Sequence, residues 1–417
     1  MDGFGNVAAT GHFNGTTDFG GGSVSSYVHP NLGPTTDIFV ASYSPSGGYR
    51  WTRALGNDGT EEGKGVATDP AGNVLVTGYQ GSYWVDYGGG PQTSASYTDI
   101  FIAKYSSAGG WVWSKTVGGY AYDQGNAIAA DGAGNVLVTG YFGKATIGDT
   151  GVNFGGGALF SAGGFDAFLV KYSVTGQHVW SKRLGGTGTD NGLAVGTDSA
   201  GNVYVAGTFE GAVDFGAGSV TSAGLRDIFL VKYSSAGQFL WFKRFGGSGD
   251  DVVNSLAIDT AGEVVLSGKF QGSVSFGGAS LTSAGGDDAF LVKLSTSGDQ
   301  RWAKRFGAAS QDISTGVAVD GGGNVVVAGY FAGTVDFGGG ALTSLGIDVF
   351  TAKYDPSGTH TWSRRYGGTD TQICDGVAAA PTGEVTVTGF FNQTIDLGSG
   401  LLTSAGGFDA FLAGIGP

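Results

Sequence analysis

The stretch that decides the fold runs from Asp312 to Tyr366 and reads DISTGVAVDGGGNVVVAGYFAGTVDFGGGALTSLGIDVFTAKYDPSGTHTWSRRY. Short apolar runs lie in it at 316–320, 325–329, 348–354 and 361–366. Each run is rich in β-branched or aromatic residues and is bounded by Gly, Pro, Asn or Asp, a pattern that predicts strands. We name these strands a, b, c and d in chain order, and a long segment separates b from c.

This unit is repeated along the whole chain. The Asp-x-Phe pair of strand c recurs seven times, with its aspartate at Asp37, Asp99, Asp166, Asp227, Asp288, Asp348 and Asp409. The steps between these aspartates are 60 to 67 residues. No window keeps a 3.6-residue apolar period, so we expect no helix of consequence. The sequence therefore predicts an all-β fold, a seven-unit β-propeller of four-stranded antiparallel blades.

The two ends of the chain interrupt the repeat. The chain opens at strand b, at 6–11, and closes at strand c, at 409–415, so the first and last units are incomplete. Trimmed end blades and strands donated by a neighbouring chain both remain open, and the second would give an oligomer through the end blades. Met1 directly precedes a repeat interior, so we expect the missing signal segment to say little about location. We predict a single domain over 1–417, with units at approximately 1–56, 57–118, 119–185, 186–246, 247–307, 308–367 and 368–417.

The composition excludes several classes of protein. Glycine makes up 83 of 417 residues and charged residues only 13%, which fits many tight turns and opposes disorder. Cys374 is the single cysteine, so no intrachain disulfide forms. No apolar stretch approaches the ~20 residues of a transmembrane helix. The net charge of −14 argues against nucleic acid and anionic membranes as partners.

Recurring strings point to a family. Gly-Val-Ala-Val-Asp, Gly-Asn-Val-x-Val-x-Gly, Gly-x-x-Asp-x-Phe-x-x-Lys-Tyr and Trp-x-Lys-Arg-x-Gly-Gly cover nearly the whole chain. They resemble the bacterial beta-propeller repeats called SBBP repeats. This resemblance implies a secreted or cell-surface bacterial protein, and it brings no catalytic residues to transfer.

Each strand has a predicted place in its blade. Strand a, small and uncharged, is expected innermost, and strand d outermost. The d-strand tryptophans are predicted to pack between blades rather than to bind ligands: Trp51, Trp113, Trp180, Trp241, Trp302 and Trp362. Turns such as Asp69-Pro-Ala-Gly-Asn73 have too few alternating oxygen ligands for a calcium loop and are interpreted as hairpin turns.

The long d–a and b–c connections share one face, where binding residues are expected. The d–a connections place one acid before most inner strands: Glu61, Asp123, Asp190, Asp251 and Asp312, with Gln372 as a departure. The b–c connections carry Asp18, Asp86, Asp214, Asp336 and Asp396. One interpretation is an acidic mouth that binds a cation or polyol, with calcium as a candidate cofactor. The other is that each carboxylate caps its own turn.

Aromatic residues break the repeat in the second b–c connection, which carries Tyr83, Trp84, Tyr87 and Tyr97. They suit sugar or peptide recognition, or else they cover the neighbouring loop. The four histidines are scattered, and no nucleophile elbow, zinc motif or P-loop appears. We therefore predict a non-enzymatic, secreted or cell-surface binding or scaffold propeller with a carbohydrate or protein partner. The alternatives are a lectin with sites on the long-loop face and a hydrolase that uses loop carboxylates.

Overall fold

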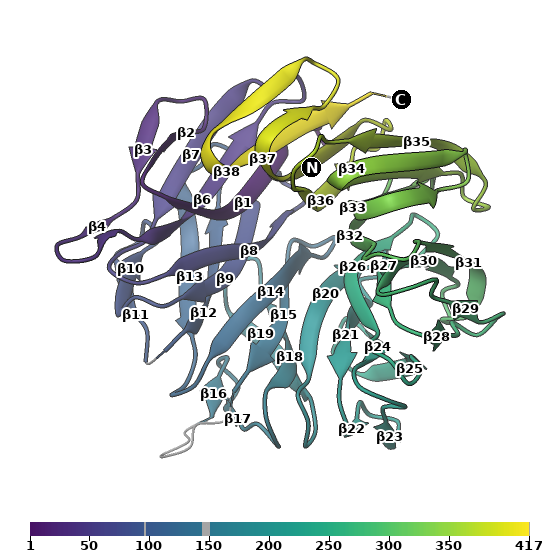
Figure 1. Cartoon of the computed structure of the whole chain (residues 1–417). Coiled ribbons are helices and arrows are strands. Elements are labelled where there is room, and N and C mark those ends of the chain that lie inside the picture. Colours follow the sequence, from purple (N-terminus) through teal and green to yellow (C-terminus); the bar gives the residue numbers. More distant parts are fainter. Residues whose placement is uncertain (96, 144–150, 417) are drawn as a thin grey trace. The chain divides into compact units, whose positions relative to one another are not determined.

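The computed structural model describes residues 1–95, 97–143 and 151–416. All helical or extended elements among these residues are β-strands, and none is a helix (Figure 1). They form seven blades of four antiparallel strands each, except that the first and last blades have three. The predicted all-β, seven-unit propeller with incomplete end units is confirmed.

The chain divides into two compact units. The first comprises 1–221 with 231–240, and the second comprises 222–230 with 241–417. The fourth repeat contributes to both units. The single-domain organisation over 1–417 stays a prediction.

The first unit contains the blades of the first three repeats. The first blade has the order β1 (Val7–Asn14), β6 (Thr36–Tyr43), β7 (Tyr49–Leu55). The second consists of β8 (Glu61–Thr68), β9 (Val74–Gln80), β12 (Asp99–Tyr105) and β13 (Trp111–Val117). The third consists of β14 (Asp123–Ala130), β15 (Val136–Phe142), β18 (Asp166–Tyr172) and β19 (His178–Leu184). The fourth repeat supplies β20 (Asn191–Thr197), β21 (Val203–Phe209), β24 (Asp227–Tyr233) and β25 (Phe239–Phe245).

The second unit contains the last three blades. The fifth consists of β26 (Val252–Ile258), β27 (Val264–Phe270), β30 (Asp288–Leu294) and β31 (Gln300–Phe306). The sixth consists of β32 (Ile313–Val319), β33 (Val325–Asp336), β34 (Ala341–Tyr354) and β35 (His360–Tyr366). The seventh consists of β36 (Gln372–Ala379), β37 (Val385–Asp396) and β38 (Leu401–Ile415).

The b–c connections, expected as long loops, contain further β-hairpins. The small hairpins are β2 (Thr16–Asp18) with β3 (Ser23–Ser25), β4 (Val28–His29) with β5 (Gly33–Pro34), β10 (Trp84–Asp86) with β11 (Pro91–Thr93), β16 (Val152–Asn153) with β17 (Ala158–Leu159), β22 (Ala212–Asp214) with β23 (Ser219–Thr221), and β28 (Ser273–Val274) with β29 (Leu281–Thr282). In the last two blades, the hairpin is continuous with strands b and c. Glycines at positive φ, such as Gly88 at 115° and Gly90 at 102°, make the turn that an L side chain would strain.

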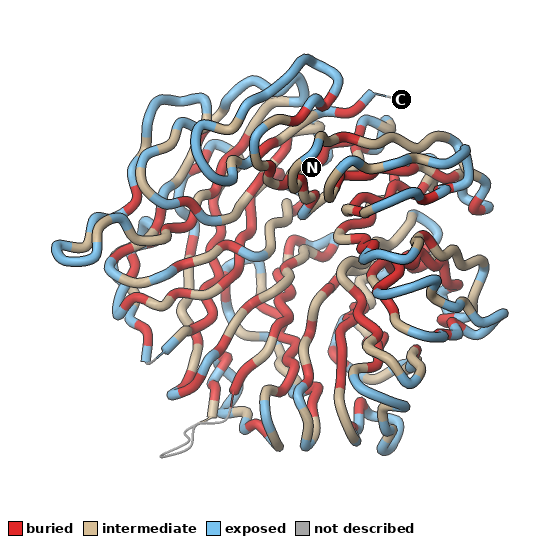
Figure 2. Tube along the Cα trace, viewed as in Figure 1, coloured by how far each residue is buried: buried red, intermediate tan, exposed pale blue. Residues whose placement is uncertain are grey.

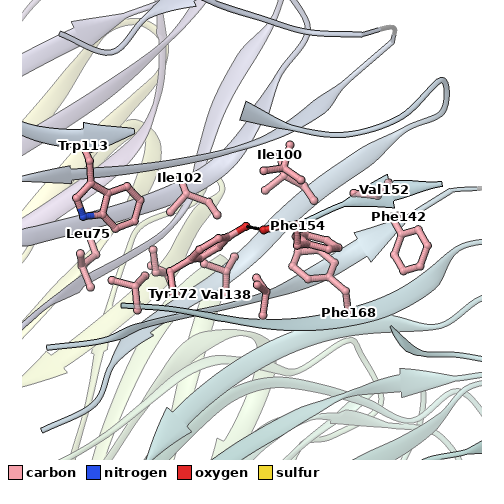
Figure 3. Packing of buried hydrophobic residues seen from close by; sticks show 14 residues of the cluster. Leu75, Ile100, Ile102, Trp113, Val138, Phe142, Val152, Phe154, Phe168 and Tyr172 are labelled. Atoms are coloured by element: carbon pink, nitrogen blue, oxygen red, sulfur yellow. Dashed lines mark hydrogen bonds between the residues drawn. The ribbon is translucent and has the colours of Figure 1, made fainter. Parts of the chain in front are cut away.

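The core lies between stacked blades and along their middle strands. Strands β12, β18 and β30 are buried at every position, because their two faces pack on neighbouring elements. Figure 2 shows these buried stretches, whereas the hairpin turns and much of β38 are exposed. In Figure 3, the Tyr172 hydroxyl donates to the Phe154 carbonyl at 3.0 Å, which ties the b–c hairpin to strand c of its own blade.

The d-strand tryptophans pack against the following blade, as predicted. The Trp113 indole N–H donates to the Val174 carbonyl at 3.1 Å, and the ring lies against Gly176 in the same turn. The equivalent bonds run from Trp51 to Ser107, Trp180 to Ser235, Trp241 to Thr296 and Trp302 to Pro356. Each of the first five blades is thus joined to the c–d turn of the next, whereas the Trp362 indole N–H of the sixth has no hydrogen-bond partner among the described residues.

The c-strand lysines are largely buried. Lys104 donates to the Asp69 carboxylate at 2.8 Å, and both side chains are almost fully enclosed. The same pair recurs as Lys171–Asp131, Lys232–Asp198, Lys293–Asp259 and Lys353–Asp320. Asp69 also accepts the backbone N–H groups of Ala71 and Asn73, so the interpretation as a hairpin turn is confirmed.

Candidate functional site

The acids that precede the inner strands are buried side chains that accept backbone hydrogen bonds. Glu61, Asp123, Asp190, Asp251 and Asp312 all lie in the interior. Each carboxylate accepts the N–H of the residue four positions earlier, for example Gly119 N–H to Asp123 at 2.7 Å. The other Asp123 oxygen accepts the N–H of Gly143, at the end of strand b, at 3.0 Å. This is the geometry of the capping alternative, and ligand binding by these carboxylates stays a prediction.

Burial perturbs these carboxyl groups. Desolvation raises the pKa of Asp190 to about 7 and that of Asp251 to about 6. It also raises the pKa values of Glu61 and Asp312. The hydrogen bonds from the backbone oppose this effect without cancelling it. Burial therefore makes Glu61, Asp190, Asp251 and Asp312 weaker acids than exposed carboxyl groups.

The b–c acids make the hairpin turns. Asp86 Oδ1 accepts the N–H groups of Gly88 at 2.7 Å and Gly90 at 2.9 Å. Asp18, Asp214, Asp336 and Asp396 repeat these contacts, and Asn153 substitutes for aspartate with the same geometry. In the second blade the turn glycines lie against Trp111, the first residue of the outer strand. The hairpin therefore lies along the outer part of its own blade.

The aromatic cluster of the second b–c connection does not stay together. Tyr83 and Trp84 are 72% and 41% exposed at the start of the hairpin. Tyr87 is fully buried, stacks on Phe101 with ring centroids 5.1 Å apart, and donates its hydroxyl to Gln80. Tyr97 belongs to a different cluster, described next. Sugar stacking on Tyr83 or Trp84 stays a prediction.

A tyrosine-lined pocket lies in the first unit, between the second and third repeats. Its volume is about 430 Å³, and its walls are Thr60, Tyr79, Gly81, Tyr97, Thr98, Tyr122, Gln124 and Tyr141. The exposed rings of Tyr97 and Tyr122 lie 4.9 Å apart at 30°. A short parallel bridge between Thr98 and Tyr122 brings them together. We call this the tyrosine pocket.

Hydrogen bonds position the inner two tyrosines. The Tyr141 hydroxyl donates to Gln124 Oε1 at 3.3 Å, and the Tyr79 hydroxyl bonds to Glu62. Burial, and then the nearby Glu62 carboxylate, raise the pKa of Tyr79, so its phenol stays protonated. Lys64 neutralises Glu62 and lies 5.8 Å from the Tyr79 ring centre. The pocket walls themselves carry no charged side chain.

The tyrosine pocket was missed by the sequence analysis, apart from Tyr97. Its residues come from the end of β9, from the b–c and d–a connections and from β14 and β15. A signal was present at Tyr122, which stands where three other units have Thr60, Thr189 and Thr371. None of the five capping acids lines this pocket.

Two other kinds of site, a metal centre and a membrane span, were also considered against the described residues. Among the residues described, no three His, Cys, Asp or Glu side chains gather as a group that could hold a metal ion. Calcium binding therefore stays a prediction without a preformed site of that kind. No helix within the described ranges has the length and apolarity needed to cross a membrane.

Comparison with known proteins agrees with this architecture. The family model of the SBBP beta-propeller repeat matches residues 179–208. An uncharacterized WD repeat-containing protein of Acanthamoeba polyphaga mimivirus is 24% identical over 363 residues, which are 71% of this chain and 26% of that protein. The regulatory protein FlaEY of Caulobacter vibrioides is 26% identical over 250 residues, which are 55% of this chain and 26% of that protein.

The chain spans about a quarter of the length of both curated relatives. Among solved structures, the WD40 domain of Neurospora crassa Pan2 aligns with a TM-score of 0.39 and 9% identity, over 78% of this chain and 74% of that one. The fold and the repeat matches support a β-propeller with a scaffold or binding role.

Proposed function

We propose that the protein is a non-enzymatic binding propeller that works outside the cell or at the cell surface and holds a neutral carbohydrate in the tyrosine pocket. The pocket carries this proposal. It is concave, its rings are aromatic, and its polar groups are few, which is the usual composition of a small-ligand site. The extracellular location rests on the resemblance to SBBP repeats.

The chemistry of the walls favours a neutral sugar. The apolar face of a pyranose ring can stack on Tyr97 or Tyr122, while its hydroxyl groups reach Gln124 and Thr98. The absence of charge on the walls gives no partner for an anionic ligand. The net charge of −14 repels polyanions at long range, so we expect no binding of duplex DNA at physiological salt.

A glycan screen with matched variants tests the site. Tyr97→Ala and Tyr122→Ala each remove one exposed ring, and we expect a roughly two- to twelvefold loss of affinity, because a stacked ring contributes about 0.5–1.5 kcal/mol. Tyr83→Ala is the matched control, because it removes an exposed tyrosine from the same connection but outside the pocket. Trp84→Ala tests the alternative site on the hairpin. Each titration is run with calcium and with a chelator, which tests the calcium prediction.

The outcomes separate the alternatives. Loss of binding in Trp84→Ala but not in Tyr97→Ala would move the site to the hairpin. Binding of none of the glycans would refute the lectin proposal and favour a protein scaffold. Release of reducing sugar from a bound glycan would contradict the non-enzymatic proposal. Such hydrolysis usually needs two carboxyl groups roughly 5–9.5 Å apart across the scissile bond.

A further inference from the structure

Part of the tyrosine pocket has its hydroxyl hydrogens already engaged. The walls carry six hydroxyl groups, and those of Tyr79, Thr98 and Tyr141 are hydrogen-bonded to other groups of the protein. A hydroxyl that donates its hydrogen to a neighbour can still accept a hydrogen bond through its oxygen lone pairs. The direction of these three bonds therefore decides what this part of the pocket offers to a ligand.

Two of the three directions follow from the nature of the acceptor. Thr98 donates to the backbone carbonyl of Asp123 at 3.3 Å, and a carbonyl oxygen can only accept. Tyr79 bonds to Glu62, which is paired with Lys64. Burial opposes the ionisation of Glu62, but the hydrogen bond and the charge of Lys64 outweigh burial and lower the pKa of this carboxyl group. Glu62 is therefore a carboxylate, which can only accept, and Tyr79 is the donor.

The third direction is set from the next repeat. Asn126 Nδ2 lies 2.9 Å from the carbonyl oxygen of Gly192, so the amide of Asn126 must turn its nitrogen to this side. Its Oδ1 then accepts from Gln124 Nε2 at 2.6 Å, because the opposite orientation of Gln124 would bring two amide oxygens to this distance. Gln124 consequently turns its Oε1 to Tyr141, whose hydroxyl donates to it at 3.3 Å. We call the chain of Asn126, Gln124 and Tyr141 the amide relay.

The amide relay belongs to the tyrosine pocket, whereas its anchor is a feature of the repeat. Asn254 takes the place of Asn126 in the fifth repeat and donates in the same way to the Ser314 carbonyl at 2.9 Å. The fifth repeat has Val252 where the third has Gln124, so the relay cannot form there. The bond to the following repeat is thus a recurring structural contact, and its extension into a pocket is the departure.

We propose that the tyrosine pocket accepts hydrogen bonds from free sugar hydroxyl groups through the oxygens of Tyr79, Thr98 and Tyr141. Asn126 is a positioning residue for this selection, because it holds Gln124 and, through Gln124, the hydrogen of Tyr141. The inference rests on the proposed binding of a neutral sugar and narrows the class to sugars that are unsubstituted where they meet these oxygens. Ethers, esters and carboxylates present only lone pairs there and lose these hydrogen bonds.

The probes are the methyl glycosides of D-glucose, D-galactose and D-mannose, each with single fluoro or amino replacements of its ring hydroxyl groups. Fluorine is close to a hydroxyl group in size but cannot donate, whereas the amine still donates. We expect at least one of the three parent sugars to bind the 417-residue chain in titration calorimetry. At one or more ring positions, fluorine should weaken binding about two- to twelvefold, the range of one lost neutral hydrogen bond, and the amine should not weaken it.

Asn126→Ala tests the amide relay. It frees Gln124 to turn its nitrogen toward Tyr141, so that the Tyr141 hydrogen can point into the pocket and the loss caused by fluorine should fall below about twofold. Asn254→Ala is the matched control, because it removes the equivalent bond to the following repeat and should leave the effect of fluorine unchanged. Tyr141→Phe removes one of the accepting oxygens but keeps the ring, so it should also reduce the effect of fluorine, and it provides the test if Asn126→Ala does not fold.

The outcomes distinguish this inference from the proposed function. Equal affinity of parent and fluoro sugars at every ring position, or amino sugars as weak as the fluoro sugars, would overturn the inference and leave sugar binding intact. An unchanged effect of fluorine in both Asn126→Ala and Tyr141→Phe, or an equal change in Asn254→Ala, would also overturn it. Binding of none of the three parent sugars would refute the proposed function and this inference with it.

Discussion

Replacing Trp113 with alanine should destabilise the second and third blades. The side chain is only 8% exposed, packs on Gly176 and belongs to the cluster drawn in Figure 3. A buried tryptophan removes about 150–250 Å² from water, which at about 25 cal/mol per Å² gives roughly 4–6 kcal/mol as an upper bound. Measured losses for large aromatic residues in cores are about 3–5 kcal/mol. We expect Trp113→Ala to lower the free energy of unfolding by about 3–5 kcal/mol.

Trp111→Ala is the control, because it removes the same side chain two positions earlier in β13. Trp111 is 41% exposed, and its indole bonds only to Ser114 nearby, so we expect a loss of about 1 kcal/mol. A repeat array does not have to unfold in one step, so urea midpoints should be accompanied by hydrogen exchange at β12 and β18. Equal losses for the two variants would refute the packing role of the outer-strand tryptophans.

Three further results are expected. First, the pKa of Asp190 is raised to about 7, mainly by burial, above its unfolded value near 4. The stability that this raised pKa contributes is present below about pH 4 and is lost as the pH rises to about 7, by roughly 1–3 kcal/mol. Asp190→Asn should therefore flatten the plot of urea midpoint against pH between these two values. An unchanged slope would contradict the raised pKa of Asp190. Second, burial raises the pKa of the Cys374 thiol to about 12, so a thiol reagent should label it only after unfolding, whereas rapid labelling of the native protein would be inconsistent with its position. Third, we expect the chain to pass through a duplex DNA column at physiological salt without binding, because its net charge is −14. Retention on the column would show that the acidic net charge does not govern its partners.

The strands and their order could be predicted because the period is regular and each run is bounded by turn residues. The b–c hairpins could not be predicted in this way. Most of their strands are only two or three residues long, and the glycines between them are typical of loops. The burial of the c-strand lysines follows from a paired pattern. Five units carry both the turn aspartate and the lysine, and the seventh unit has Ala380 and Gly414 at these two places. The first unit, with Asp2 and Ser42, breaks this rule.

The tyrosine pocket was harder to predict for a physical reason. A repeat places equivalent residues at equivalent positions, whereas a pocket between two blades combines positions that are not equivalent. Tyr79 and Tyr141 end strand b in consecutive units, but Tyr122 lies in a d–a connection and Tyr97 in a b–c connection. In the sequence, the site is indicated only by the departure of Tyr97 and Tyr122 from the repeat. That these two residues lie close together can be seen only in the structure. The five capping acids recur in nearly every unit, and the contacts that they make are structural. A site is therefore marked by departure from the repeat, and a structural contact by repetition.

The tryptophan bonds between blades give the chain a direction during its synthesis. Each indole donates to a carbonyl 54 to 61 residues later in sequence, so an outer strand leaves the ribosome well before its acceptor exists. At about 5–20 residues per second, the delay is roughly 3–12 s for each of these five bonds. During that interval the tryptophan of the outer strand stays uncovered at the growing end. A nascent propeller of this kind therefore presents one unfinished blade at a time to chaperones. Slower translation lengthens the time for which its tryptophan is exposed, but does not increase the number of tryptophans exposed at once.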